Sequence, residues 1–210
     1  MVGDQGRGPV RGRGGRGGRA TGGAGGRRLV ADADLAVVAG QLGRRPHPVN
    51  RVACRCPHGL PAVVETLPYD AAGRPFPTLF WATCPTLIAA VGALESAGGV
   101  RRFETMVRDH ARLAASLAAA TAYDRRRRRT LARRYALPGR DGGASLATGI
   151  AGVRRARPAT PRLKCLHAHA AHALARPGYD LGEAVLAAAG ELWCVDRRCA
   201  AWAPVSGGAA

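Results

Sequence analysis

Apolar residues recur at helical spacing in several segments of the chain. The clearest stripe, with apolar side chains at i, i+3, i+4 and i+7, predicts a helix from about residue 32 to Gly43, capped by Asp32 or Asp34. Pro85 suits the first turn of a second helix, and Gly98 suits its end. Similar spacing predicts further helices over about residues 101–108, 111–135, 161–176 and 180–193.

Three short segments between the first two helices are rich in β-favouring residues. They cover Val49 to Cys56, Leu60 to Leu67 and Thr78 to Cys84, and turn-forming sequences separate them. Short strands so close in sequence predict a small antiparallel sheet. The expected fold class is therefore α+β, with a sheet of about three strands packed against several helices in a single domain.

The composition changes at both ends of the chain. Residues 1–28 contain seven Arg and much Gly, a composition that buries too little apolar surface to offset the loss of chain entropy. We expect a disordered Arg/Gly-rich tail over residues 1–30, a single α+β domain with the Cys and His residues over 31–203, and a disordered tail over 204–210.

The chain is strongly basic. Its formal charge of +18 and pI of about 11.4 favour polyanionic partners such as nucleic acid. Of the 32 cationic residues, 31 are Arg and Lys164 is the single Lys, a bias that a GC-rich coding sequence would also produce. The candidate surface for nucleic acid or an acidic protein is the run Arg125, Arg126, Arg127, Arg128 and Arg129.

Targeting and membrane signals do not stand out in the sequence. No apolar run approaches the roughly 18 to 20 residues that a membrane span requires, so membrane insertion is not expected. The first thirty residues lack the apolar core of a secretory signal. We therefore expect a cytoplasmic protein with reduced thiols, in which clustered Cys and His indicate metal or thiol chemistry before disulfides.

A first group of candidate ligands lies in the predicted sheet. Cys54, Cys56 and His58 alternate at the end of the first strand, and Cys84 follows one strand away. Alternate residues of a strand share a face and a neighbouring strand lies about 4.8 Å away, so two or three of these side chains can converge on one ion. The alternative is a set of small buried thiols without metal.

A second group lies on a predicted helix, where Cys165, His167, His169 and His172 occur within eight residues. Helical positions three or four apart share a face, which pairs Cys165 with His169 and His169 with His172. His167 points elsewhere unless the helix starts after it. A metal shared by the two groups would resemble a structural or catalytic zinc site, and the alternative is a mixture of core and surface histidines.

Four further residues bear on this chemistry. Cys194 and Cys199 either complete the cluster, form a second site or do neither. Glu65 and Glu95 are the acidic residues nearest to the Cys clusters in sequence; each is expected to be a surface charge, and the alternative is a general base beside a metal. No GxSxG nucleophile elbow occurs in the chain.

Three stretches of the chain carry a resemblance: RCPHGLPAVVETLP, GRPFPTLFWATCP and LKCLHAHAAHALA. From about Asp34 to at least Gly182 the sequence resembles a bacterial family catalogued as domain of unknown function five hundred and one. The resemblance implies one folded unit and no particular reaction. It also implies that position 84 alternates between Cys and His, as a zinc ligand tolerates. The ligands that it favours are Cys56, Cys84, Cys165 and either His167 or His172.

These observations leave three hypotheses for the function. The first is a zinc-binding structural or regulatory module with ligands from Cys56, Cys84, Cys165, His167 and His172. The second is a metal-dependent hydrolase or a thiol enzyme, in which Glu65 or a spare His serves as the base. The third is a basic nucleic-acid-binding protein without metal, which would bind through the Arg-rich helix.

Overall fold

The computed structural model describes residues 30–150 and 162–204. The predictions of disorder for the two tails concern residues outside these ranges, apart from one residue at the edge of each. Part of the linker expected over about 138–161 also lies outside them. None of the described helices is long and apolar enough to cross a membrane.

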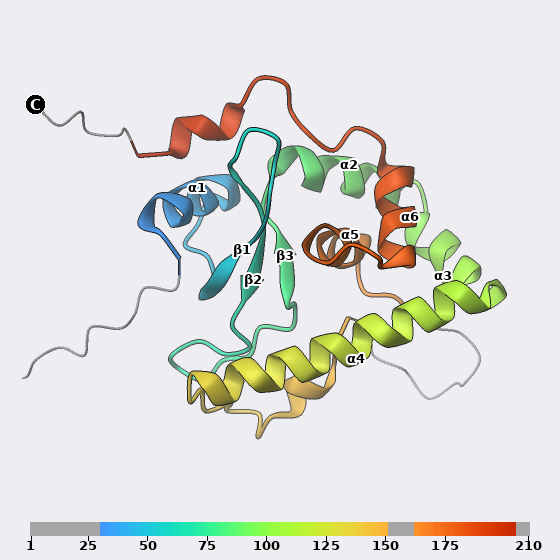
Figure 1. Ribbon diagram of the computed structural model, residues 1–210, viewed down its shortest axis with the longest axis horizontal. Coiled ribbons are helices and arrows are strands. Elements are labelled where there is room, and N and C mark those ends of the chain that lie inside the picture. Colours follow the sequence, from blue (N-terminus) through green and yellow to red (C-terminus); the bar gives the residue numbers. More distant parts are fainter. Residues whose placement is uncertain (1–29, 151–161, 205–210) are drawn as a thin grey trace, which may run out of the picture.

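The described residues form six α-helices around one three-stranded antiparallel sheet, which confirms the predicted α+β class (Figure 1). The strands are β1 (Val49–Arg55), β2 (Pro61–Thr66) and β3 (Phe80–Ala82), in the order β1-β2-β3. The helices are α1 (Asp32–Leu42), α2 (Pro85–Ser96), α3 (Gly99–Asp109), α4 (Ala111–Arg134), α5 (Leu166–Ala175) and α6 (Asp180–Ala189). Two 3₁₀ turns, η1 (Ala144–Ala147) and η2 (Arg198–Trp202), follow α4 and α6.

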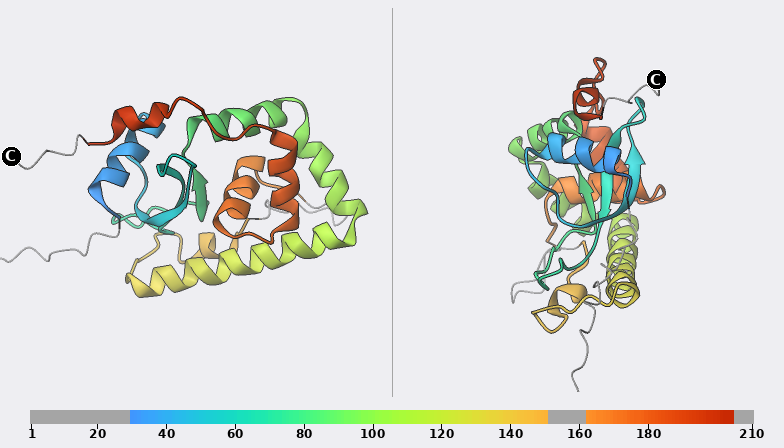
Figure 2. Two further views of the ribbon diagram at one scale, coloured as in Figure 1. Left: turned by 45° about the horizontal axis from the view of Figure 1, so that its top comes forward. Right: turned by 90° about the vertical axis from the view of Figure 1, so that its left-hand side faces the viewer.

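The sheet lies between α1 and α5 (Figures 1 and 2). Every residue of β2 is buried, because β2 is the central strand and both of its faces are covered. Val64 packs with Val38 of α1 in a small cluster, whereas Val63 belongs to the main core together with Leu166 of α5. Alternation along one strand therefore supplies both hydrophobic layers.

Helix α5 starts later than the spacing of apolar residues predicts. The expected helix covered 161–176, but α5 begins at Leu166, because Cys165 has an extended backbone with φ −67° and ψ 149°. The carboxylate of Glu95, at the end of α2, accepts the backbone N–H of Leu166 and so supplies a partner for the first turn. The start of α5 is thus set by a tertiary contact.

Helix α4 crosses the end of the sheet and is joined to β2 by a buried ion pair. Glu65 is fully buried, and its carboxylate accepts hydrogen bonds from Arg127 at 2.7 and 2.9 Å, from Asn50 at 2.6 Å and from Arg51 at 3.0 Å. Burial opposes ionisation, but the hydrogen bonds from Arg127 and Asn50 lower the pKa of Glu65 below its usual value. The expectation of a surface charge at Glu65 was wrong, since its strand is covered on both faces.

Replacing Glu65 by Gln should destabilise the protein. The Glu65→Gln variant keeps the shape of the side chain but leaves Arg127 without a counter-charge. We expect a loss of about 3 kcal/mol in the free energy of unfolding, the lower end for a broken buried pair because Arg127 keeps some contact with solvent. Urea denaturation measures this loss. The control is Asp109→Asn, which removes an exposed partner of Arg108 and should leave stability unchanged; equal effects of the two variants would contradict the prediction.

Candidate metal centre

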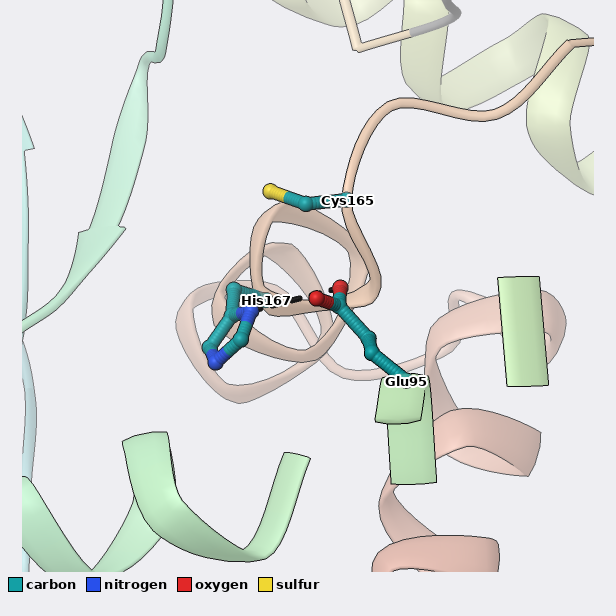
Figure 3. A group of neighbouring side chains, drawn as sticks. All are labelled: Glu95, Cys165 and His167. Carbon is teal, nitrogen blue, oxygen red and sulfur yellow. Dashed lines mark ion pairs between the residues drawn. The ribbon is translucent and has the colours of Figure 1, made fainter. Parts of the chain in front are cut away.

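Three potential metal ligands meet where α2 ends and α5 begins (Figure 3). Among the described residues, Glu95, Cys165 and His167 are the one group whose ligand atoms all lie within 4.8 Å of one another. Glu95 extends from the last turn of α2, Cys165 directly precedes α5, and His167 lies in the first turn of α5. The group could therefore hold a metal ion.

The electrostatics of the group favour a thiolate beside an imidazolium. A hydrogen bond with His167 lowers the pKa of the Cys165 thiol, and the backbone N–H of Ala168 acts in the same direction. The same pair raises the pKa of His167 to about 9, helped by the carbonyl of Ile88 and the charge of Glu95. The thiolate is the form of Cys that binds metals and attacks electrophiles, so Cys165 is suited to either chemistry.

The imidazole of His167 is oriented by contacts on both of its nitrogens. Its Nε2 donates a hydrogen bond to the backbone carbonyl of Ile88 at 3.0 Å, and its Nδ1 lies 3.3 Å from the carboxylate of Glu95. Metal-binding histidines characteristically donate one ring N–H to a carbonyl and use the other nitrogen as ligand. If His167 loses a proton, Nδ1 is therefore the nitrogen left to face an ion beside Glu95 and Cys165.

The expected pairing of Cys165 with His169 does not occur. Because Cys165 precedes the helix, its thiol approaches His167, while His169 is fully buried with Nδ1 2.7 Å from the hydroxyl of Tyr179 in a hydrogen bond. Burial lowers the pKa of His169 to about 3, so this imidazole stays neutral. His169 therefore belongs to the core.

His172 also lies apart from Glu95 and Cys165. It is buried, its Nδ1 lies 3.1 Å from a carboxylate oxygen of Asp124, and its ring packs against Phe80 and Tyr179. The Nδ1 and oxygen atoms are too poorly aligned to form a regular hydrogen bond. Its position on the helix places His172 in the core of the protein, whereas the three-residue group lies at the start of α5.

Cys56 and Cys84 form part of a different thiol group. Cys84 is buried directly before α2, and Cys56 is half-buried just after β1. Their charges, together with that of Cys194, act on the buried thiol of Cys199. The five predicted ligands are thus divided over three places in the fold: Cys165 with His167, Cys56 with Cys84, and His172 by itself.

The Arg run on α4 is divided between the surface and the interior. Arg125, Arg126 and Arg129 are exposed, whereas Arg127 pairs with Glu65. Arg128 is buried, and its guanidinium donates to the carbonyl of Phe76 at 2.8 Å. Binding of nucleic acid or an acidic protein by this run stays a prediction, and only part of the run is available for it.

Sequence reasoning missed Glu95 as a ligand candidate, because it expected a surface charge there. Its neighbours on α2 gave no signal, and only the packing of α2 against α5 brings its carboxylate to Cys165.

A wide groove of about 1020 Å³ lies elsewhere, between α1 and the loops that contain His47 and Arg74, and Cys residues do not line it. Two of its lining residues, Val30 and Val49, also belong to the small hydrophobic cluster that contains Val38 and Val64.

Alkylation should show whether His167 activates Cys165. In the metal-free protein at pH 7.5, iodoacetamide should modify Cys165 faster than Cys54, since burial raises the pKa of the Cys54 thiol. In His167→Gln the rate at Cys165 should fall by about threefold for each unit by which its pKa rises, because a smaller thiolate fraction outweighs higher nucleophilicity. Peptide mass spectrometry reads both sites, with Cys54 as the internal control. An unchanged rate at Cys165 would show that the pair has no effect.

Comparison with known proteins places the chain within a family. No curated protein and no solved structure is significantly similar to the chain. A family model described as "Protein of unknown function (DUF501)" matches residues 52–187, a range that contains Glu95, Cys165 and His167. The resemblance expected from the three sequence stretches is therefore confirmed. The chain belongs to the DUF501 family.

Proposed function

We propose that the protein is a zinc-binding module in which Glu95, Cys165 and His167 hold the ion. The observation that carries this proposal is the mutual approach of one carboxylate, one thiol and one imidazole within 4.8 Å. Zinc accepts all three donor types, whereas magnesium and calcium prefer oxygen ligands alone. The contact of Nε2 with Ile88 supports the proposal, because it already orients His167 for coordination through Nδ1.

The number of ligands points to the kind of module. Zinc in proteins is usually four-coordinate, so three protein ligands leave one position for water or for a group from a partner. Among the described residues, no fourth Cys, His, Asp or Glu has a ligand atom within 4.8 Å of all three. A hydrolytic role needs a general base in addition to the ligands. A regulatory or binding role therefore fits the centre better than hydrolysis.

A second candidate function is thiol chemistry by Cys165 without metal. It is favoured by the lowered pKa of this exposed thiol, which lies beside His167 at the start of a helix. The carboxylate of Glu95, 3.3 Å from Nδ1, would then stabilise His167 as an imidazolium beside the Cys165 thiolate. Zinc and an electrophile would compete for the same sulfur, so protection of Cys165 from iodoacetamide by zinc separates the two functions.

Zinc affinity at this centre should rise with pH. His167 has a pKa of about 9 in the metal-free protein, so below that pH an ion must displace its proton. The apparent affinity should increase about tenfold per pH unit for each proton released, and it should level off above pH 9. Competition with a chromogenic chelator at several pH values, on protein purified without a His-tag, measures this slope.

Removal of one ligand tests the composition of the centre. We expect Glu95→Gln, Cys165→Ala and His167→Gln each to weaken this zinc site by at least about tenfold. Asp109→Asn, which removes an exposed carboxylate elsewhere, serves as the control. Unchanged zinc stoichiometry and affinity in all three variants would exclude this centre, whatever metal the protein binds at other positions.

A further inference from the structure

Four thiols outside the proposed centre lie around the start of β2. Two of them come from the sheet region. The turn after β1 is closed by the N–H of Cys56, which donates to the carbonyl of Leu60 at 2.9 Å, and by the N–H of Gly59, which donates to the carbonyl of Cys56 at 2.9 Å. The N–H of Cys84 donates to the carbonyl of Ala62 at 3.3 Å, which ties the start of α2 to the same end of β2.

The C-terminal segment brings the other two thiols to this place. After α6 the chain returns across the sheet to α1, where η2 packs (Figures 1 and 2). His58, in the turn after β1, donates from Nε2 to the carbonyl of Cys194 at 2.7 Å. Cys199 lies in η2 and is buried, although its neighbour Val195 is almost fully exposed.

A contact between η2 and α1 fixes the position of Cys199. The indole of Trp202 lies directly over Gly40, where any Cβ would meet the ring at 2.2 Å. Gln41, the next residue of α1, donates to the carbonyl of Pro61 at 2.8 Å. The side chain of Gln41 also interacts with the thiol of Cys199. These contacts hold the start of β2, the end of α1 and η2 together around Cys199.

The thiols influence one another across this point. The thiol of Cys199 lies within electrostatic reach of the thiols of Cys84, Cys194 and Cys56. A soft divalent metal is the ligand that such a group of thiols suits, because it binds them as thiolates and offsets their repulsion.

We infer that Cys56, Cys84, Cys194 and Cys199 form a second, closed zinc site, which clasps the C-terminal segment to the sheet. Four thiolates complete the tetrahedral coordination of zinc and leave no open position, as in structural zinc sites. The four sulfur atoms lie farther apart than the three ligand atoms of the first centre, which are within 4.8 Å of one another. Binding therefore requires the thiols to turn inward about χ1 between staggered rotamers. This inference does not depend on the centre at Glu95.

Cobalt spectra of the full-length protein test the second site. Cobalt(II) substitutes for zinc, and its sulfur-to-metal charge-transfer absorption grows with the number of thiolate ligands. Cys165→Ala, which lacks the first centre, should bind about one equivalent of cobalt with the d–d bands of a tetrahedral tetrathiolate. In the wild-type protein, added zinc should displace the cobalt and abolish this spectrum. A Cys165→Ala protein with no such spectrum would overturn the inference without touching the proposal for the first centre.

A variant of the second site and a matched control identify its ligands. Cys199→Ser should lose the tetrathiolate spectrum, whereas Cys54→Ser, which changes a half-buried thiol of β1 outside the group, should keep it. Wild-type protein should bind about two equivalents of zinc and Cys199→Ser about one. Should Cys199→Ser fail to fold, the spectrum of Cys165→Ala still decides. A tetrathiolate spectrum that persists in folded Cys199→Ser would overturn the ligand set.

Proteolysis tests the structural role of the site. With zinc bound, trypsin should cleave slowly after Arg197 and Arg198, and removal of the metal by a chelator should accelerate cleavage there at least about tenfold, because the segment is then free to open. Mass spectrometry identifies the cut. Equal rates with and without chelator would contradict the clasp. A disulfide between Cys194 and Cys199 in protein purified in the presence of a reductant, detected as a mass two units lower, would also contradict it.

Discussion

The structure depends on the burial of α5 on nearly all of its sides. Seven of its residues are buried, four of them Ala, so the helix is narrow enough to fit between the sheet, α2 and α6. Its contact with α6 is especially close, since a Cβ on Gly182 would lie 2.6 Å from the carbonyl oxygen of His169. A helix enclosed in this way cannot shift without disturbing every layer. The position of its first turn, and of Cys165 and His167 with it, is therefore fixed by the whole core.

Enclosure of α5 brings polar groups into the core, and some of their atoms have no hydrogen-bond partner there. His169 stays neutral and bonds to Tyr179, while His172 lies beside the carboxylate of Asp124. Arg128 comes from α4 toward the same region and is buried as well. Buried polar groups of this kind are destabilising unless they are paired. Two of the histidines in the Cys/His-rich stretch are thus buried in the core, whereas His167 lies at its edge beside Cys165 and Glu95.

Much of the fold could be predicted from the sequence, because periodicity of apolar residues reports burial directly. Each predicted helix and strand has a counterpart, and the sheet is antiparallel as expected. The site was predicted only in part. Cys165 and His167 were expected as ligands and do meet, but Glu95 joins them through the packing of α2 on α5, which no local pattern records. Similarly, the burial of Glu65 and Arg128 follows from the crossing of α4 over the sheet, and a charge run alone indicates a solvated face.

We propose two roles for the cysteines. One role is an open centre at the start of α5, where a thiolate, an imidazole and a carboxylate leave a coordination position free. The other is a closed site that holds the C-terminal segment. The central claim is the first, since it alone gives the protein a place to act on another molecule. Crystals grown with zinc and measured on both sides of the zinc absorption edge test it most directly. We predict an anomalous peak about 2.0 to 2.3 Å from ligand atoms of Glu95, Cys165 and His167. An ordered α5 with no peak at its first turn would contradict it.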